Sequence, residues 1–288
     1  MQALRSVPAK APDAAVATLL RRRDLDLYWS ALFAPQAARS HLHALYAFHT
    51  ELRRIPLLTT EPMVGQIRLQ WWRDAIDLAT PETKTGNPIA DGLSAAIFAR
   101  GLSKEPLNAM IDARIGDLYK ETPANMAGLH GYLDATEGTM FETASIIAGE
   151  AAEASQTAAR QAGRAFGLMR ILNSLPQQVA RRHLMVPAEL LQSRKIDLAR
   201  LYQGDVPSAF TILAARLRTE AFENRKLAAA SSAQLQKGGV IAFLPLAPVV
   251  LYLKKLEKLG VNALKQQVTV SPPARFLRIW RAARRGKI

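Results

Sequence analysis

Long segments rich in Ala, Leu, Arg and Gln, separated by short breaks at Pro and Gly, make up most of this 288-residue chain. These residues favour helices, and the alternation typical of strands is scarce. We therefore expect an all-α protein of roughly eight to ten helices in an antiparallel array. Because no Gly/Ser/Pro-rich stretch is long enough to be a linker, we expect one domain over residues 24–288, preceded by a basic, flexible leader over residues 1–23.

The Pro and Gly breaks also set approximate helix boundaries, and Pro56 is expected to end the second helix. The helix expected at 63–79 carries a stripe at three- and four-residue spacing that we predict to face the core. That stripe consists of Val64, Ile67, Trp71, Ala75 and Leu78. Further helices are expected at about 24–34, 35–54, 88–99, 106–120, 130–148, 151–175, 187–191, 207–230, 241–259 and 273–283.

The chain carries a formal net charge of +14, with 38 Lys and Arg against 24 Asp and Glu. Such a balance favours anionic partners, namely nucleic acid, phosphates or acidic lipid headgroups, without choosing among them. Cysteine is absent, which excludes disulfides, thiolate metal sites and cysteine nucleophiles, and which fits a reducing compartment.

No targeting or membrane-spanning signal stands out. The longest apolar run, 240–253, is interrupted by Pro245 and Pro248 and falls short of the roughly 20 residues that a membrane span needs. The N-terminus lacks the apolar block of a secretory signal, although its Arg- and Ala-rich character is shared by mitochondrial transit peptides. We expect a cytoplasmic bacterial protein, peripheral at the inner membrane, or its counterpart on the matrix side of a mitochondrion.

Common catalytic motifs are missing: the sequence has no P-loop, no GxSxG elbow, no HExxH and no EF-hand loop. His41, His43 and His49 fall on one helix, but their spacing prevents them from sharing a metal there. Acidic pairs occur at helical spacing, and we interpret them as solvated helix faces. These pairs are Asp74 with Asp77, Asp112 with Asp117, and Glu137 with Glu142.

Five segments, in chain order, resemble those of the squalene and phytoene synthases. They are LYAF at 45–48, RLQWWRD at 68–74, IDARIGDL at 111–118, GLMRILN at 167–173 and RRHLMVP at 181–187. The resemblance covers roughly residues 24–260 and implies an isoprenoid-synthase-type helical bundle around a central cavity. In that family, two Asp-rich motifs hold Mg²⁺ against prenyl diphosphates, because carboxylates suit Mg²⁺ and the metal neutralises the leaving group.

Both Asp-rich motifs are lost from this chain. Arg53, Arg54 and Leu57 stand where the resemblance places the first motif, and the stretch at 176–178 (Pro-Gln-Gln) stands where it places the second. Arginine cannot ligate Mg²⁺, and neutral Gln is a poor replacement for a carboxylate. We therefore assign no catalytic residue, no metal ligand and no cofactor, with Mg²⁺ expected only if the family activity survives.

These departures match the branch of synthase-like assembly factors of respiratory complex I. The resemblance implies complex I subunits or assembly proteins as partners, with a prenyl or lipid ligand in the old cavity. Candidate cavity-lining residues, by resemblance, are Tyr46, Arg53, Arg54, Arg68, Trp71, Asp117, Arg170, Asn173, Gln177 and Arg181. The alternative is an active prenyltransferase in which arginines bind the diphosphate without metal, since Arg suits phosphate by its bidentate geometry.

The C-terminal segment 272–288 combines an aromatic apolar stripe with many arginines. This combination suits the surface of an anionic bilayer, where the contact residues would be Arg275, Arg278, Trp280, Arg281 and Arg285. A terminal helix that packs its aromatic residues on the core is an equally good interpretation. Nucleic acid is an unlikely partner, because no reader motif accompanies the charge.

Overall fold

The computed structural model describes residues 11–82 and 84–288, which are helical or irregular with no strand among them. The N-terminal half contains α1 (Ala11–Arg23), α2 (Leu25–Leu32), α3 (Gln36–Leu58), α4 (Pro62–Asp77), α5 (Pro88–Arg100), α6 (Lys104–Asp112), α7 (Ile115–Leu118), α8 (Met126–Leu133), the π-helix η1 (Asp134–Gly138) and α9 (Thr139–Ile147). The C-terminal half contains α10 (Ala152–Asn173), α11 (Leu175–Ala180), α12 (Ala188–Ser193), α13 (Leu198–Tyr202), α14 (Ser208–Ser232), α15 (Lys237–Val240), the 3₁₀ turn η2 (Ile241–Leu246), α16 (Val249–Leu259), the 3₁₀ turn η3 (Gly260–Leu264) and α17 (Pro272–Arg285).

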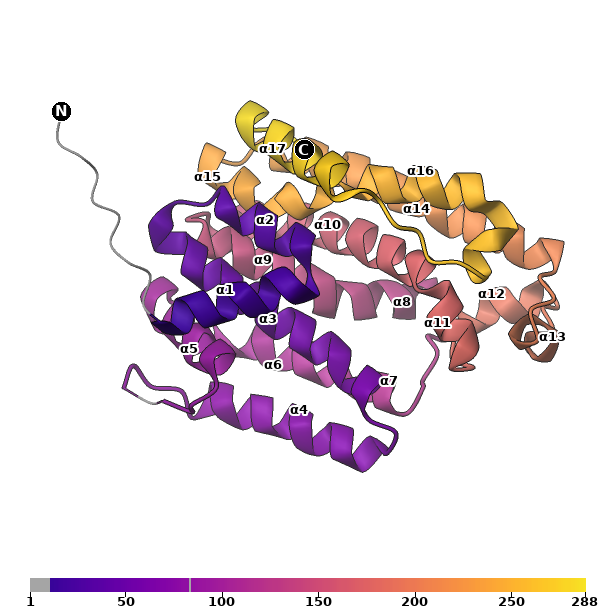
Figure 1. The fold of residues 1–288 in the computed structure, drawn as a ribbon, viewed down its shortest axis with the longest axis horizontal. Coiled ribbons are helices and arrows are strands. Elements are labelled where there is room, and N and C mark those ends of the chain that lie inside the picture. The colour runs from indigo at the N-terminus through magenta and orange to yellow at the C-terminus, as the bar shows by residue number, and fades with distance from the viewer. Residues whose placement is uncertain (1–10, 83) are drawn as a thin grey trace.

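Two long helices organise the bundle (Figure 1). The helix α3 packs against α1, α2, α5 and α9, while α10 packs against α14, α9, η1 and α16. Because α9 contacts both long helices, it joins the two halves. The helices α4 and α17 lie at opposite outer edges of the bundle (Figure 1).

The prediction of a flexible leader over residues 1–23 is wrong for residues 11–23, the part that the structure describes. Residues 11–23 form α1, in which Val16 and Leu20 are buried in the main core. These two residues are one turn apart and so present a single apolar side to α3 and α5. The remainder of the leader, residues 1–10, lies outside the described residues.

The helix α3 continues past Pro56 to Leu58, although the proline was expected to end it. Pro56 lies in the last turn, so it removes a single intrahelical hydrogen bond and the helix ends two residues later. The guanidinium of Arg181 donates to the carbonyl oxygens of Pro56 (3.4 Å) and Leu57 (3.0 Å), which satisfies acceptors at the end of the helix.

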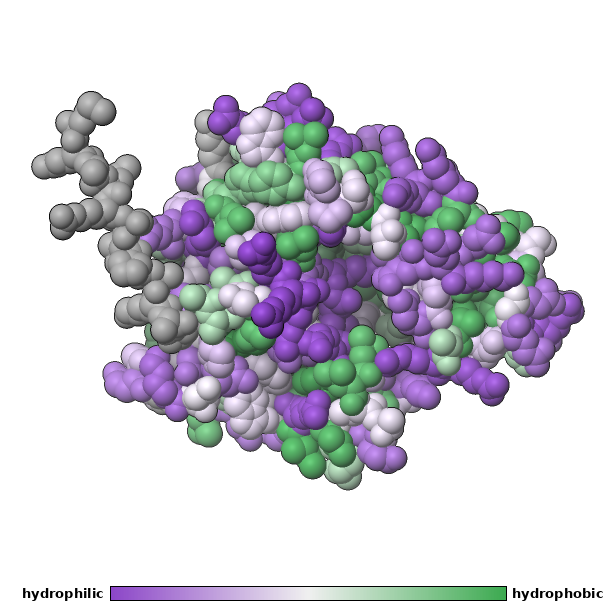
Figure 2. All heavy atoms as spheres, in the orientation of Figure 1, coloured by the Kyte–Doolittle hydropathy of each residue, from purple (hydrophilic) through white to green (hydrophobic). Residues whose placement is uncertain are grey.

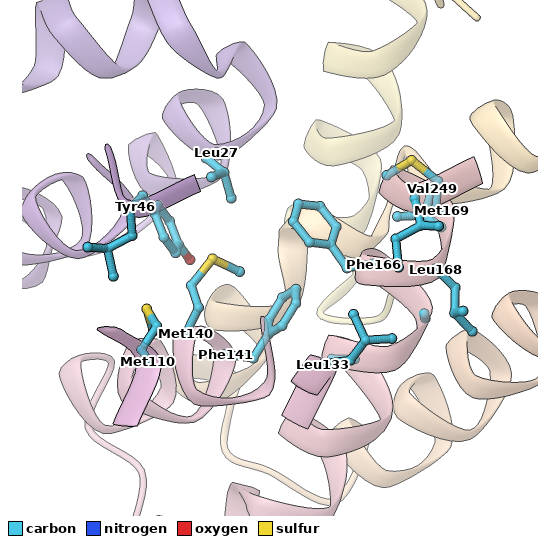
Figure 3. Packing of buried hydrophobic residues seen from close by; sticks show 14 of the residues in the cluster. Leu27, Tyr46, Met110, Leu133, Met140, Phe141, Phe166, Leu168, Met169 and Val249 are labelled. Atoms are coloured by element: carbon cyan, nitrogen blue, oxygen red, sulfur yellow. The ribbon is translucent and has the colours of Figure 1, made fainter. Parts of the chain in front are cut away.

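The centre of the bundle is filled where the resemblance implied a cavity. Tyr46, Phe48, Phe141 and Phe243 have no accessible surface. A side chain without accessible surface cannot border a void that admits water, so these residues enclose no such space. Phe141 stacks on Phe243 with ring centroids 5.8 Å apart. It also meets Phe166 edge-on at 5.5 Å (Figure 3). Packed aromatic rings thus replace the expected cavity at this place.

One stretch of the described chain, Gly238–Leu264, is long and apolar enough to cross a membrane. The expectation that no stretch reaches this length was therefore wrong by length and composition. In this structure, 72% of its most apolar window is buried inside the protein. Its apolar side chains, among them Phe243 and Leu253, belong to the core of the bundle.

Candidate functional site

A cluster of five polar side chains lies inside the bundle, and we refer to it as the polar cluster. His49 comes from α3, Tyr132 from α8 and Glu137 from η1. Arg114 directly precedes the short helix α7, and Asp117 lies within it. The side chains of His49, Glu137 and Arg114 are 0%, 5% and 6% exposed. These three side chains are therefore buried, whereas Asp117, whose side chain is 15% exposed, lies at the edge of the cluster.

The cluster is held together by ion pairs and hydrogen bonds. Nε2 of His49 lies 2.7 Å from Oε2 of Glu137, and Nη2 of Arg114 lies 3.5 Å from Oε1 of the same carboxylate. Nη1 of Arg114 lies 3.3 Å from Oδ2 of Asp117, which also accepts a hydrogen bond of 2.8 Å from the hydroxyl of Tyr132. Each carboxylate thus faces a basic side chain.

Burial and charge compete at Glu137. Burial raises the pKa of this carboxyl group, but the neighbouring His49 and Arg114 lower it more, so that its pKa lies below the usual value. Burial also lowers the pKa of Arg114, yet Tyr132 and the two carboxylates raise it above its ordinary value. Glu137 and Arg114 are therefore both held in their charged forms.

The π-helix η1 positions Glu137 and is itself fixed to α10. Asp134 accepts two hydrogen bonds from Arg164, at 2.9 and 2.7 Å. Gly163 lets the backbones of α10 and η1 approach closely, because a Cβ there would lie only 2.3 Å from the nitrogen of Gly138. A π turn inserts one residue into a helix and often marks a functional position. Here it turns a charged residue toward the core.

The donor set does not fit the magnesium ions that the resemblance implied for an active enzyme. Within the part of the chain that the structure describes, no group of three or more His, Asp or Glu residues could hold a metal. Asp117 and Glu137 each already face Arg114. A guanidinium beside a carboxylate takes the place that Mg²⁺ would need, because both are positively charged and bind the same oxygens. We derive no reaction step through a metal at this place.

The residues at the position of the first Asp-rich motif lie on α3, close to the polar cluster. Arg53 is half-buried and follows His49 by one turn on the same side of the helix. Arg54 lies 3.6 Å from Glu51. The predicted candidate Arg181 reaches this end of α3 through its two hydrogen bonds to backbone carbonyls. These three arginines therefore belong to one region, although Arg54 and Arg181 already have partners.

The candidates on the second-motif side are engaged in packing contacts. Arg170 pairs with Asp24 and covers the ring of Phe166 at 4.3 Å. Oδ1 of Asn173 accepts from the backbone nitrogen of Val268 at 2.8 Å, which fixes the strap that leads to α17. The amide of Gln177 donates to Gln267 in the same strap, at 2.9 Å. These three side chains thus make contacts that hold the fold together.

Three further candidates lie apart from one another. Tyr46 is fully buried in the core, and burial raises its pKa. Arg68 and Trp71 lie on the outer face of α4, where Trp71 is 41% exposed. The expectation that they line a cavity is wrong, because α4 turns its other side to the core: Gly65, Leu69, Trp72 and Ile76 are the buried residues.

Sequence reasoning found Asp117 but missed the other four members of the polar cluster. The sequence excludes His49 only from a shared metal site and favours a solvated helix face for Glu137. A usable signal was present, since the carboxylate of Glu137 falls between the apolar residues Leu133 and Phe141 at helical spacing. An acid in an apolar stripe indicates a buried partner of opposite charge.

The C-terminal helix α17 lies on the bundle with Ile279 and Ala282 inward. Arg275 is wrong as a membrane-contact residue, because Nη1 donates to Asp26 at 2.9 Å and to the hydroxyl of Tyr252 at 3.1 Å. The other residues predicted for the membrane contact are exposed, with Trp280 at 40%. The helix thus packs through Ile279 and Ala282, and not through its aromatic residues as one interpretation had it, since Phe276 and Trp280 are 38% and 40% exposed. The membrane contact of the exposed face stays a prediction.

The family model for squalene/phytoene synthase matches residues 20–274, and the chain belongs to this family. Its fold is that of the isoprenoid synthases. The structure of a dehydrosqualene synthase covers 95% of this chain and superposes with a TM-score of 0.79 at 16% identity. Squalene synthase HpnC from Alicyclobacillus acidocaldarius covers 86% with a TM-score of 0.72 at 17% identity. The all-α prediction and the bundle type are confirmed.

The relatives found by sequence are named as assembly factors and not as synthases. The proteins from Bos taurus and Homo sapiens called NADH dehydrogenase (ubiquinone) complex I, assembly factor 6, are each 24% identical over 267 residues. The match covers 91% of this chain and 80% of either relative. A homologue from Dictyostelium discoideum is 23% identical over 265 residues, covering 88% of this chain and 71% of that protein.

Proposed function

We propose that this chain is a non-catalytic member of the squalene/phytoene synthase family that acts in the assembly of respiratory complex I. The observation that carries the proposal is the polar cluster, in which Arg114 and His49 already face the carboxylates of Asp117 and Glu137. Prenyl-diphosphate chemistry needs carboxylates that are free to hold Mg²⁺ and a cavity that shelters a carbocation. The described residues at the centre offer neither.

The role in complex I assembly is proposed from the names of similar proteins. Proteins named as complex I assembly factors match nearly the whole chain. A fold that keeps its helices while filling its centre suits a role in which the surface, and not the interior, does the work. We expect the partners to be complex I subunits or other assembly proteins.

We place the chain at a membrane surface through α17 and the neighbouring α16. From residue 258 to the C-terminus the sequence contains eight Lys and Arg and no acid. Arg278, Arg281, Arg284 and Arg285 are exposed beside the partly exposed ring of Trp280. Arginines around an aromatic ring suit the headgroup region of an anionic bilayer. Such a surface belongs to the inner membrane of a bacterium or mitochondrion, where complex I resides.

Deleting the gene in the organism that encodes this chain tests the proposal. We expect less assembled complex I on native gels and slower NADH oxidation by isolated membranes, both restored by the wild-type gene. Complementation by a Glu153→Gln variant serves as a control, because Glu153 is exposed in the first turn of α10. Intact complex I together with altered isoprenoid lipids would overturn the proposal and favour a surviving prenyltransferase.

A further inference from the structure

The helix α4 is apolar on both of its sides. Its inner side carries Leu69, Trp72 and Ile76, each buried against the rest of the bundle. Its outer side carries Met63, Val64, Ile67, Trp71 and Leu78, with exposed fractions of 64%, 44%, 63%, 41% and 72%. Four of these residues, Val64, Ile67, Trp71 and Leu78, belong to the stripe that the sequence predicts to face the core, and only its fifth member, Ala75, is partly buried there.

Two leucines at the end of α3 extend this outer side. Leu57 and Leu58 are 51% and 57% exposed, and three residues separate Leu58 from the start of α4 at Pro62. We call these seven residues the α4 face. Figure 2 shows hydrophobic surface along the lower edge of the molecule, where Figure 1 places α4. Single exposed apolar residues are ordinary, but several on one side of a helix often mark an interaction site.

A helix that is apolar all round is normally buried between two layers. In this chain one layer, formed by α3, α5, α6 and α7, covers the inner side of α4. The α4 face has the shape of a helical ridge, since Met63, Ile67 and Trp71 follow at intervals of four residues along a helix of about 24 Å. Such a ridge fits the grooves of another helix.

The ridge contains a firmly held aromatic side chain. The indole of Trp71 packs edge-on against that of Trp72, with ring centroids 5.0 Å apart, and Trp72 in turn packs on Phe48 at 5.2 Å. Trp71 is thus anchored to the core while 41% of it remains exposed. Tryptophans of this kind are enriched among the residues that dominate protein–protein affinity.

The charges around the α4 face distinguish it from the basic surface of α17. On α4 and the adjacent α6 the acids are Glu61, Asp74, Asp77, Glu105 and Asp112, and the bases are Arg68, Arg73 and Lys104. Acids therefore outnumber bases by five to three along α4 and α6, although the whole chain is +14. The bases Arg53, Arg54 and Arg181 lie at the other end of the face, beside Leu57. An anionic bilayer would be repelled by these carboxylates, whereas basic residues beside an apolar helix would be attracted.

We propose that the α4 face is a docking surface for an amphipathic helix of a partner protein, with basic residues flanking its apolar stripe. The helix-in-groove mode fits the ridge, and the local acids set the charge preference. This inference rests on the proposed assembly role only for the expectation of a protein partner. Because α4 lies across the molecule from α17, a protein bound at α17 to a bilayer leaves the α4 face free (Figure 1).

The test uses two synthetic helical peptides of about 18 residues with the same Leu/Ile stripe, one flanked by Lys and the other by Glu. Binding is measured by fluorescence anisotropy, and the contact is located by hydrogen–deuterium exchange of the full chain. We expect the Lys-flanked peptide to bind more tightly and to slow exchange at 62–77. The variant Ile67→Ser/Trp71→Ser should weaken binding roughly tenfold or more.

Two further variants keep the test decisive. Ile212→Ser changes a residue with similar exposure, 57%, on α14 and should bind like wild type. Asp74→Lys should weaken binding of the Lys-flanked peptide and strengthen binding of the Glu-flanked one. Far-UV circular dichroism checks that each variant is folded.

Four outcomes would overturn the inference: unchanged binding by the folded Ile67→Ser/Trp71→Ser variant, a preference of wild type for the Glu-flanked peptide, protection of 62–77 by anionic vesicles, or protection of 62–77 by self-association. The vesicle result would identify a lipid surface, and self-association a second copy. Because none of these readouts measures complex I, failure here is distinguishable from failure of the assembly role.

Discussion

Nε2 of His49 lies 2.7 Å from Oε2 of Glu137, in a place where neither side chain is more than 5% exposed. The other oxygen of the Glu137 carboxylate, Oε1, lies 3.5 Å from Nη2 of Arg114. The carboxylate is therefore held between His49 and Arg114. Acidic and basic side chains thus occupy this part of the interior together. Buried pairs contribute little net stability, but removing one partner leaves a costly uncompensated charge.

We therefore expect Glu137→Gln to lower the free energy of unfolding by about 3–5 kcal/mol. Chemical denaturation followed by circular dichroism measures this directly. The matched control is Glu153→Gln, which is exposed and should change stability by less than about 0.5 kcal/mol. Equal, small effects of the two substitutions would mean that Glu137 is not a buried charged partner.

The close approach of Gly163 to Gly138 gives a second prediction. A Cβ at residue 163 would lie 2.3 Å from the backbone nitrogen of Gly138, so that Gly163→Ala should cost about 1–3 kcal/mol through overpacking. Gly131→Ala is the control, because a Cβ there meets nothing within 4 Å. In a helix interior this control should raise stability by roughly 0.5–1 kcal/mol. Differential scanning calorimetry of both variants checks the opposite signs.

The contact between α2 and α17 predicts a pH dependence. Burial, reinforced by Asp24, raises the pKa of Asp26 to about 6, although Arg275 and Tyr252 lower it. An acid with a raised pKa in the folded state binds its proton more tightly there. Its contribution to stability is therefore present at low pH and is lost as the pH rises from about 4 through about 6.

The measurement is the difference in unfolding free energy between wild type and Asp26→Asn over this pH range. The difference is needed because His43, whose pKa is lowered to about 4 mainly by burial, acts with the opposite sign in the same range. We expect stability to fall less with rising pH in Asp26→Asn than in wild type. Parallel curves for the two proteins would contradict the raised pKa.

The membrane contact predicts a loss of vesicle binding when exposed arginines of α17 are neutralised. Arg281→Gln/Arg285→Gln should weaken binding to phosphatidylglycerol vesicles by about 2 kcal/mol, or roughly thirtyfold. Arg21→Gln/Arg68→Gln removes the same charge from α1 and α4 and should bind nearly as wild type does. Sedimentation with vesicles at two salt concentrations measures both. Equal losses in the two variants would indicate a response to net charge alone.

The bundle could be predicted from sequence because helix propensity and Pro/Gly breaks act locally. The orientation of α4 could not, since it carries two interleaved apolar stripes and periodicity alone does not say which one faces the core. The buried stripe contains Leu69, Trp72 and Ile76, whereas the stripe predicted to be buried is the one that contains Ile67 and Trp71. A helix with two apolar sides needs its neighbours to be known before its inner face is known.

The candidate site was predicted only in part, for a related reason. Arg53 and Arg54 stand out against a family pattern at known positions. His49 and Glu137 lie 88 residues apart in sequence, and their meeting depends on the π turn of η1, which no local pattern announces. The filled centre likewise depends on how Phe141, Phe166 and Phe243 pack together, which is a tertiary property.

Diphosphate release by the purified chain tests the central claim most directly. The protein is incubated with farnesyl or geranylgeranyl diphosphate and Mg²⁺, and released diphosphate is compared with that in buffer alone and in the presence of a chelator. A fold that has lost its metal ligands and closed its centre should release none above the buffer rate. Release that requires Mg²⁺ and stops on chelation would contradict the account.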